Sequence, residues 1–177
     1  MASVFLIGFM GAGKSTVGEK LAASLGWTFH DLDKEIERRT GQTIPQIFET
    51  SGEQEFRRIE FEALQELLAG QKRETIYALG GGAIESPNLW GLIANHVTVY
   101  LDGDFDFLVR RCAGEGDTRP VLRDPEQARI RFMRRQPLYR RASFTVRVHE
   151  GEHCRSPQEL AEEVRNLLRH VCLNAGL

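Results

Sequence analysis

The stretch GFMGAGKS at residues 8–15 is the segment from which the fold of this 177-residue chain can be predicted. It has the spacing G-x-x-x-x-G-K-S, follows an apolar run at residues 4–7, and precedes a helix-forming run at residues 16–23. Strand, glycine-rich turn and helix, in that order, are the context in which this spacing binds phosphate groups. Glycines let backbone N–H groups approach closely, and the positive end of the following helix points at the same place.

Residues of this loop have expected roles in holding a nucleotide. Lys14 is expected to reach the β- and γ-phosphates, and the Ser15 hydroxyl is expected to be a ligand of Mg²⁺. The expected nucleotide contacts in the loop are Gly11, Ala12, Gly13, Lys14, Ser15 and Thr16.

The rest of the chain alternates short apolar runs with longer amphipathic ones. Strands are expected at residues 4–7, 27–30, 75–79, 97–101 and 144–148, and those at 75–79 and 97–101 have the apolar character of central strands. Helices are expected at residues 14–25, 34–40, 44–50, 54–69, 88–94, 105–112, 125–135 and 157–170. This alternation predicts an α/β fold, a parallel sheet with helices on both faces.

The composition agrees with one globular domain over residues 1–177. Hydrophobic residues make up 41% of the chain and the net charge is −2, but residues 110–141 hold ten arginines and four acidic residues. A local basic cluster on an otherwise acidic chain favours a small polyanionic ligand over nucleic acid, although paired charges on solvated helix faces account for about half of these arginines.

The chain has features expected of a cytoplasmic protein. Its three cysteines are widely spaced and form no C-x-x-C motif, which is typical of a reducing compartment. It has no basic-then-apolar leader and no apolar run of 18 residues, so neither a signal peptide nor a membrane span is expected.

Asp31 and Asp33 directly follow the second expected strand. In an extended segment alternate residues share a face, so both carboxylates are expected to point into one site. Mg²⁺ takes one or two carboxylates, which leaves the other for a hydroxyl group of a substrate. The alternative is that Asp33 caps the following helix.

Arg57 and Glu60 lie three residues apart on an expected helix, so the carboxylate can hold the guanidinium. A fixed arginine is well suited to bind a carboxylate through two parallel hydrogen bonds, although an ordinary surface ion pair has the same spacing. Gly80, Gly81 and Gly82 directly follow a buried strand, which indicates that another group approaches the backbone closely there.

Two segments lack clean periodicity and follow strands, at the sheet edge where open α/β folds bind ligands. Residues 32–62 are expected to form a substrate-binding region, and residues 112–124 are expected to form a lid. His149 and His153 fit the H-E-x-x-H spacing of zinc proteases, but this copy follows a strand and has glycine in its middle. It is therefore expected to be a solvated loop.

The ordered combination of these motifs resembles the shikimate kinase family, small P-loop kinases related to nucleoside-monophosphate kinases. The phosphate-binding loop is shared with many NTPases, whereas the combination is specific, and the resemblance runs from residue 4 to about residue 157. The segments that carry it are GFMGAGKST at 8–16, the Asp31/Asp33 pair, GEQEFRRIE at 52–60, GGGAI at 80–84, RPVL at 119–122 and RQPLY at 135–139.

The resemblance implies a three-layer α/β/α fold with a five-stranded parallel sheet in the order 2-3-1-4-5. It also implies transfer of the ATP γ-phosphate to the 3-hydroxyl of shikimate in aromatic amino-acid biosynthesis. ATP with Mg²⁺ and shikimate are the implied ligands, with no nucleic-acid or membrane partner, and the implied state is a monomer.

On the phosphate side, the resemblance implies that Lys14 contacts the γ-phosphate and that Ser15 binds Mg²⁺. Asp31 would support the metal through water, and Arg119 on the lid would lie against the transferring phosphoryl group. Arg111 and the segment of Arg155 would enclose adenine, with Arg110 as the alternative to Arg111.

On the acceptor side, the resemblance implies that Asp33 binds the ring hydroxyls and acts as the base. Arg57 and Arg135 would bind the carboxylate of shikimate. The three glycines, Gly80, Gly81 and Gly82, would line the substrate, the last two through backbone N–H groups.

The chain departs from the family pattern in having Ala78-Leu79 where many members have a hydroxyl residue before the three glycines. This departure places more of the metal shell on Asp31. Two other functions remain possible at this point, namely another small-metabolite kinase such as a gluconate kinase, and a non-catalytic nucleotide-sensing or nucleic-acid-binding module.

Overall fold

The structure, a computed structural model, describes residues 3–70, 74–113, 124–151 and 153–174. Five parallel strands form its main sheet, in the order β2-β3-β1-β4-β5. Their bounds are β1 Val4–Ile7, β2 Thr28–Asp31, β3 Thr75–Ala78, β4 Val97–Asp102 and β5 Phe144–Arg147. The predicted fold class and strand order are confirmed, and β1 lies between the two strands expected at the centre.

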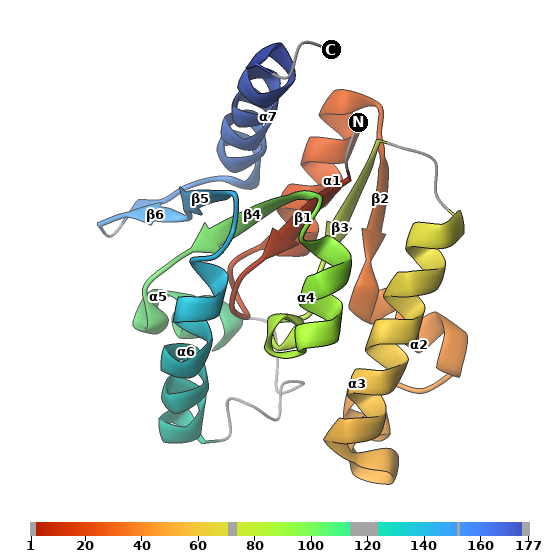
Figure 1. The fold of residues 1–177 in the computed structure, drawn as a ribbon. Helices are drawn as coiled ribbons and strands as arrows, with labels where there is room; N and C mark the ends of the chain where they lie inside the picture. The colour runs from red at the N-terminus through yellow and green to blue at the C-terminus, as the bar shows by residue number, and fades with distance from the viewer. Residues whose placement is uncertain (1–2, 71–73, 114–123, 152, 175–177) are drawn as a thin grey trace.

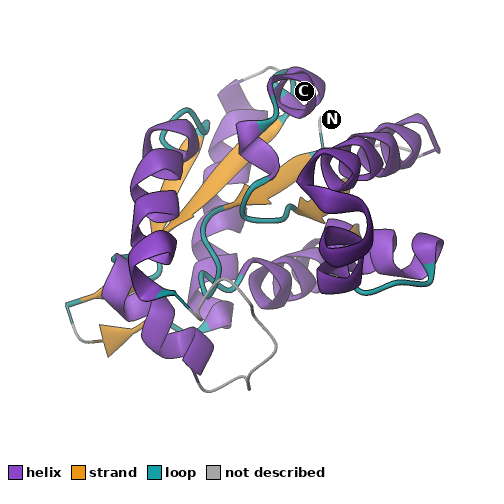
Figure 2. Ribbon diagram, turned by 90° about the horizontal axis from the view of Figure 1, so that it is seen from below, coloured by secondary structure: helices purple, strands orange, loops and turns teal. Residues whose placement is uncertain are grey.

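Helices lie on both faces of this sheet (Figures 1 and 2). Their bounds are α1 Lys14–Leu25, α2 Leu32–Thr40, α3 Ile44–Gly70, the 3₁₀ helix η1 Ala83–Glu85, α4 Pro87–Ile93, α5 Phe105–Ala113, α6 Pro125–Tyr139 and α7 Pro157–Asn174. Every residue of β1 and β3 is buried, so the core is built around these two strands. In the described part of the chain, no helix combines the length and apolar character that crossing a membrane requires.

The two helices expected at 44–50 and 54–69 are confirmed as two helical segments of α3, separated by a kink where Gly52 has the non-helical angles φ 78° and ψ 173°. Other helices differ from the prediction at their ends. Helix α6 continues to Tyr139 with Pro137 inside it. Helix α2 begins at Leu32, because the Asp31 side chain caps its first turn.

The start of α7 agrees with the local sequence. The backbone N–H of Glu159 donates to Ser156 Oγ at 3.2 Å, and Glu159 Oε2 accepts from the Ser156 N–H at 2.7 Å. These reciprocal bonds form a capping box, which satisfies N–H groups that a helix end leaves without partners.

Gly18 of α1 and Gly91 of α4 make a matched pair for testing the packing of α1 on β2. A methyl group on Gly18 would lie 2.3 Å from Cε2 of Phe29, whereas one on Gly91 would meet nothing within 4 Å. Overpacking costs about 1–3 kcal/mol, and alanine gains up to about 1 kcal/mol over glycine in a helix. We therefore expect Gly18→Ala to lower the free energy of unfolding and Gly91→Ala to raise it slightly, measured by urea denaturation. Equal effects would contradict the tight packing of α1 on β2.

Candidate active site

A cavity of about 800 Å³ lies beyond the carboxyl ends of β1, β2 and β3. It brings together most of the residues that the sequence singled out. Those that line it are Gly11, Gly13, Lys14, Ser15, Thr16, Asp31, Asp33, Arg57, Gly80, Gly81, Gly82, Arg111 and Arg135. The predicted substrate region at 32–62 supplies one wall through α2 and α3.

Of the predicted site residues that the structure describes, two are absent from this lining. Ala12, within the phosphate-binding loop, is fully buried. Arg155 is bound elsewhere, through Nη1 to the carbonyl of Arg147 at 2.9 Å and through Nη2 to Glu163 at 2.6 Å. Arg119 and most of the predicted lid lie outside the described residues.

The phosphate-binding loop ends in a helix N-terminus without a side-chain cap. Its last residue before α1, Gly13, has φ 87°, a left-handed conformation that glycine adopts without strain. The first N–H groups of a helix have no partners within the helix, so this end attracts anions. Lys14 Nζ donates to the carbonyls of Gly8 at 2.9 Å and Phe9 at 3.0 Å, which holds the ammonium beside the loop.

Asp31, the last residue of β2, forms hydrogen bonds both to Ser15 at the start of α1 and to the first turn of α2. One carboxylate oxygen accepts from the Ser15 hydroxyl, and the other accepts from the backbone N–H groups of Asp33 at 3.1 Å and Lys34 at 3.3 Å. The helix cap is therefore Asp31, and the interpretation of Asp33 as the cap is wrong. Asp33 lies in the first helical turn rather than in an extended segment, yet both carboxylates line the cavity.

Ser15 and Asp31 offer a hydroxyl and a carboxylate oxygen side by side, and both are groups that Mg²⁺ prefers. Among the described residues, no group of three or more His, Cys, Asp and Glu is placed to hold a metal ion. This donor set fits a Mg²⁺ ion that completes its shell with phosphate oxygens and water.

Asp33 has an unusually high pKa for an aspartate. Burial, and then the negative charge of Asp31, raise the pKa of Asp33 to about 6, and the opposing effects of Lys14 and Arg57 are smaller than that of burial. A carboxylate with a pKa close to neutral pH is suited to accept a proton from a substrate hydroxyl.

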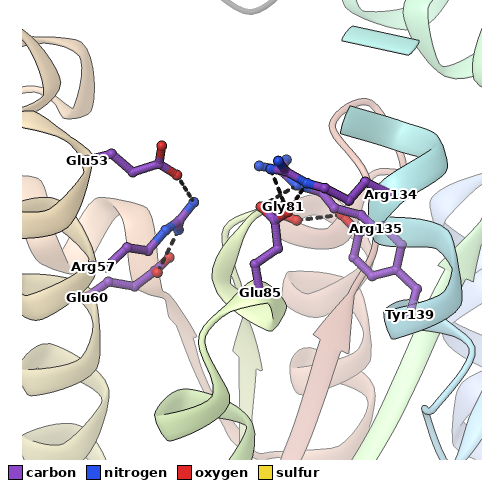
Figure 3. A network of polar contacts seen from close by, with 8 residues as sticks. All are labelled: Glu53, Arg57, Glu60, Gly81, Glu85, Arg134, Arg135 and Tyr139. Carbon is purple, nitrogen blue, oxygen red and sulfur yellow. Dashed lines mark hydrogen bonds and ion pairs between the residues drawn. The ribbon is translucent and has the colours of Figure 1, made fainter. Parts of the chain in front are cut away.

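Arg57 is held by two glutamates of its own helix (Figure 3). Its Nη1 donates to Glu60 Oε2 at 2.7 Å, and its Nη2 donates to Glu53 Oε1 at 3.3 Å. Glu60 is fully buried, so this is not the ordinary surface pair that the spacing left open. Burial raises the pKa of Glu60 to about 7 despite the facing guanidinium.

Arg135 approaches the same region from α6, on the other side of the cavity from Arg57 (Figure 3). Its Nε donates to Glu85 Oε2 at 2.8 Å. A Cβ on Gly82 would lie 2.3 Å from Arg57 Nη2 and 2.8 Å from Arg135 Nη2, so both guanidinium groups converge on this glycine.

The three glycines have different neighbours. A Cβ on Gly80 would lie 2.8 Å from Asp33 Oδ1, so side chains of the protein itself approach Gly80 and Gly82, whereas Gly81 has room for a methyl group. The carbonyl of Gly81 accepts a hydrogen bond from the Tyr139 hydroxyl. The predicted close approach of another group to the glycine backbone is therefore found at Gly80 and Gly82, where side chains of the site are the groups that approach.

On the nucleotide side, Arg111 lies beside the phosphate-binding loop. A Cβ on Gly13 would be 3.4 Å from Arg111 Nη2, and Arg111 Nη1 is buried with no hydrogen-bond partner in the described part of the chain. Arg110 is exposed on the same helix. The geometry therefore favours Arg111 over Arg110 as a contact for the nucleotide.

An apolar wall of the cavity and one residue that anchors Arg135 were not predicted from the sequence. Ile44, Pro45, Phe48 and Phe56 line the cavity, and the rings of Phe48 and Phe56 lie 4.6 Å apart. The spacing of Ile44 and Phe48 by four residues is a signal for this wall, because such residues share a helix face. Glu85, which anchors Arg135, had no comparable local signal.

The H-E-x-x-H segment is not a solvated loop. It contains the antiparallel strands β6 His149–Glu150 and β7 His153–Cys154. The His149 ring is buried, accepts from the Asp104 N–H at Nε2 and has Nδ1 2.8 Å from the carbonyl of Gly151. Stacking on Phe107 at 4.1 Å gives this histidine a structural environment that the motif did not predict.

The raised pKa of Asp33 leads to a prediction about stability. Because the pKa is higher in the folded protein than in the unfolded chain, ionised Asp33 lowers stability above about pH 6, and this cost disappears as the pH falls below the unfolded value of 3.8. We expect Asp33→Asn to raise the free energy of unfolding at pH 8 by on the order of 2 kcal/mol relative to wild type, and by much less at pH 4. Urea denaturation at both pH values measures this, and a difference independent of pH would contradict it.

Comparisons with known proteins agree with the motifs and the fold. The model of the shikimate kinase family matches residues 10–169. The shikimate kinase of Mycobacterium avium is 46% identical over 146 residues, 81% of each chain, and that of Mycobacterium tuberculosis strain H37Ra is 41% identical over 167 residues, 93% of this chain and 92% of the relative.

Solved structures give the same result. Shikimate kinase from Acinetobacter baumannii in complex with shikimate has a TM-score of 0.87 at 35% identity and covers 96% of this chain and 94% of its own. A gluconokinase from Sinorhizobium meliloti has a TM-score of 0.60 at 18% identity, covers 98% of this chain and 95% of its own, and shares the fold alone. The chain belongs to the shikimate kinase family.

Proposed function

We propose that this enzyme, an ATP-dependent kinase, transfers the γ-phosphate of ATP to the 3-hydroxyl of shikimate within the cavity at the carboxyl edge of the sheet. One observation carries the proposal: Lys14 of the phosphate-binding loop, Asp33 and the two converging arginines all line the same cavity. Phosphoryl transfer needs mainly positioning and charge stabilisation, which these groups supply.

In this proposal the loop holds the triphosphate through backbone N–H groups at the start of α1. Lys14 exchanges its hydrogen bonds to the Gly8 and Phe9 carbonyls for phosphate oxygens, and Arg111 contacts the nucleotide from α5. Arg119 and Arg155 remain predicted contacts, the first to the transferring phosphoryl group and the second to adenine.

Ser15 and Asp31 are the residues that would hold Mg²⁺. The ion, when bound, neutralises charge on the phosphate oxygens during transfer. Asp31 holds the first turn of α2 through one oxygen and Ser15 through the other, so it fixes the positions of Ser15 and Asp33 relative to one another.

On the acceptor side, Arg57 and Arg135 bind the carboxylate of shikimate above Gly82, and Asp33 binds the ring hydroxyls beside Gly80. Asp33 then takes the proton of the attacking 3-hydroxyl, in keeping with its raised pKa. Backbone N–H groups of Gly81 and Gly82 complete the substrate contacts.

The remaining features of the protein follow from this function. We propose that residues 1–177 act as one kinase domain and as a cytoplasmic monomer without a nucleic-acid partner. Several arginines of the basic segment are paired, as Arg129 is with Asp106 and Arg134 with Glu85. Arg111 and Arg135 line the cavity, and Arg135 does so while it is also paired with Glu85. The local positive charge therefore serves two anionic substrates.

The function is tested by coupled measurement of ADP release with and without shikimate. We expect release to depend on shikimate and on Mg²⁺, because the acceptor hydroxyl and the metal both take part in the transfer. The Lys14→Ala variant, which lacks the phosphate contact, is expected to show no turnover. Equal ADP release in the absence of shikimate would contradict the proposal.

The carboxylate role of Arg57 is tested by comparison with Arg58 on the same helix. Arg58 pairs with Glu55 and Glu62 at the surface, so Arg58→Ala is a matched control. Arg57→Ala removes up to two charge-assisted hydrogen bonds of about 1.5–3 kcal/mol each, so we expect at least about a tenfold rise in the KM for shikimate. The KM for ATP is expected to change little.

Arg57→Lys serves as a second variant, because it keeps a positive charge opposite the buried Glu60. Lysine lacks the planar guanidinium that can donate two parallel hydrogen bonds to a carboxylate, so the KM for shikimate is still expected to rise. Equal losses of shikimate and ATP affinity in both Arg57 variants would show that Arg57 supports the fold rather than the substrate.

A further inference from the structure

Arg135 is the second of the two converging arginines, and its orientation depends on a residue outside the cavity lining. Glu85, the last residue of η1, accepts from Arg135 Nε at 2.8 Å through Oε2. Its other oxygen accepts from Arg134 Nε at 2.7 Å (Figure 3). One carboxylate thus binds two consecutive arginines of α6, and it is largely shielded from solvent.

Glu85 contacts only Nε of Arg135, so this contact leaves Nη1 and Nη2 unoccupied by Glu85, and the Tyr139 hydroxyl also lies near the guanidinium. Because Glu85 occupies the Nε position, Nη1 and Nη2 are the atoms that remain to form two parallel bonds with a carboxylate. Nη2 already lies beside Gly82, at 2.8 Å from the position of a Cβ there. Glu85 follows Gly82 by only three residues. One short segment therefore holds both the glycine proposed to contact the substrate and the glutamate that binds Arg135.

The two sides of the carboxylate site are built alike. Glu60 holds Arg57 by Nη1 from within α3, and Glu85 holds Arg135 by Nε from η1. An arginine side chain loses considerable conformational freedom when it is fixed, and an anchor that fixes it before substrate arrives removes that cost from binding.

We propose that Glu85 is a positioning residue for the substrate: it fixes Arg135 so that its terminal nitrogens face the carboxylate bound above Gly82. This proposal rests on the proposed function. Glu85 acts only through Arg135, since it does not line the cavity itself.

The direction in which the Kd of shikimate changes when Glu85 is removed distinguishes a positioning role from a purely electrostatic one. Glu85 is an anion near the binding site of another anion, so its charge alone would repel shikimate, and its removal would then tighten binding. If Glu85 positions Arg135, its removal weakens binding, because a mobile guanidinium must be ordered at each binding event.

The experiment measures the Kd of shikimate, of its methyl ester and of ATP by calorimetry for wild type and the variants Glu85→Ala, Glu85→Gln and Arg134→Ala. We expect Glu85→Ala to raise the Kd of shikimate about threefold to tenfold, within the range for immobilising one long side chain on binding, with unchanged ATP affinity and a kcat retained at saturating shikimate. The methyl ester has the ring hydroxyls but no anionic carboxylate, so its Kd is expected to change less than twofold.

Arg134→Ala is the matched control. Arg134 shares Glu85 but is exposed and does not line the cavity, so its removal leaves the bond between Glu85 and Arg135 in place. We expect shikimate affinity to remain close to wild type. Glu85→Gln keeps the shape and one acceptor oxygen, so it is expected to lie between wild type and Glu85→Ala, and it covers the case that Glu85→Ala does not fold.

A double variant shows whether Glu85 acts through Arg135. In the Arg135→Ala background, the further change Glu85→Ala is expected to raise the Kd of shikimate less than twofold. Unchanged or tighter shikimate binding in Glu85→Ala, an equal loss for the methyl ester, or full additivity in the double variant would overturn the proposal. Failure of wild type itself to bind shikimate would instead overturn the proposed function.

Discussion

The parallel pairing of β1 with β3 is the constraint on which the site depends. Leu6 lies opposite Ala78 in the sheet, and the N–H of Leu79 donates to the carbonyl of Leu6 at 3.1 Å. Both strands therefore end at the same edge, where one continues into the phosphate-binding loop and the other into the three glycines. A Cβ on Gly81 would lie 3.5 Å from the carbonyl of Gly8, so the loops for the two substrates are in contact.

The buried ionisable groups of the site lower the stability of the fold, and apolar burial in the sheet offsets this loss. Asp33 and Glu60 both have pKa values raised mainly by burial, and both lie beside Gly80. Ionised groups in such positions lower stability, whereas the fully buried β1 and β3 contribute apolar burial directly beneath them. This arrangement keeps a proton acceptor and substrate-binding cations close together before substrate binds.

Local features were predictable from the sequence, and contacts between distant segments were not. The loop and the pairing of Arg57 with Glu60 depend on residues that are close in sequence, whereas the strand order joins distant segments and was implied only by the resemblance to a family. The bond between Glu85 and Arg135 joins residues 50 positions apart, and neither one carries a signal of the other. Likewise, the burial of His149 depends on its contacts with Phe107 and Asp104, which are distant in sequence. The capping of α2 by Asp31 is a local contact, and it differs from the prediction because the helix begins two residues earlier than expected.

The central claim is that the nucleotide phosphates and shikimate meet in one cavity between Lys14 and Asp33. A crystal structure of the protein with ADP, Mg²⁺ and shikimate tests this most directly. The account predicts the β-phosphate at the start of α1, the carboxylate of shikimate between Arg57 and Arg135, and the 3-hydroxyl within hydrogen-bond distance of Asp33. Shikimate bound with its carboxylate toward Lys14, or outside this cavity, would contradict it.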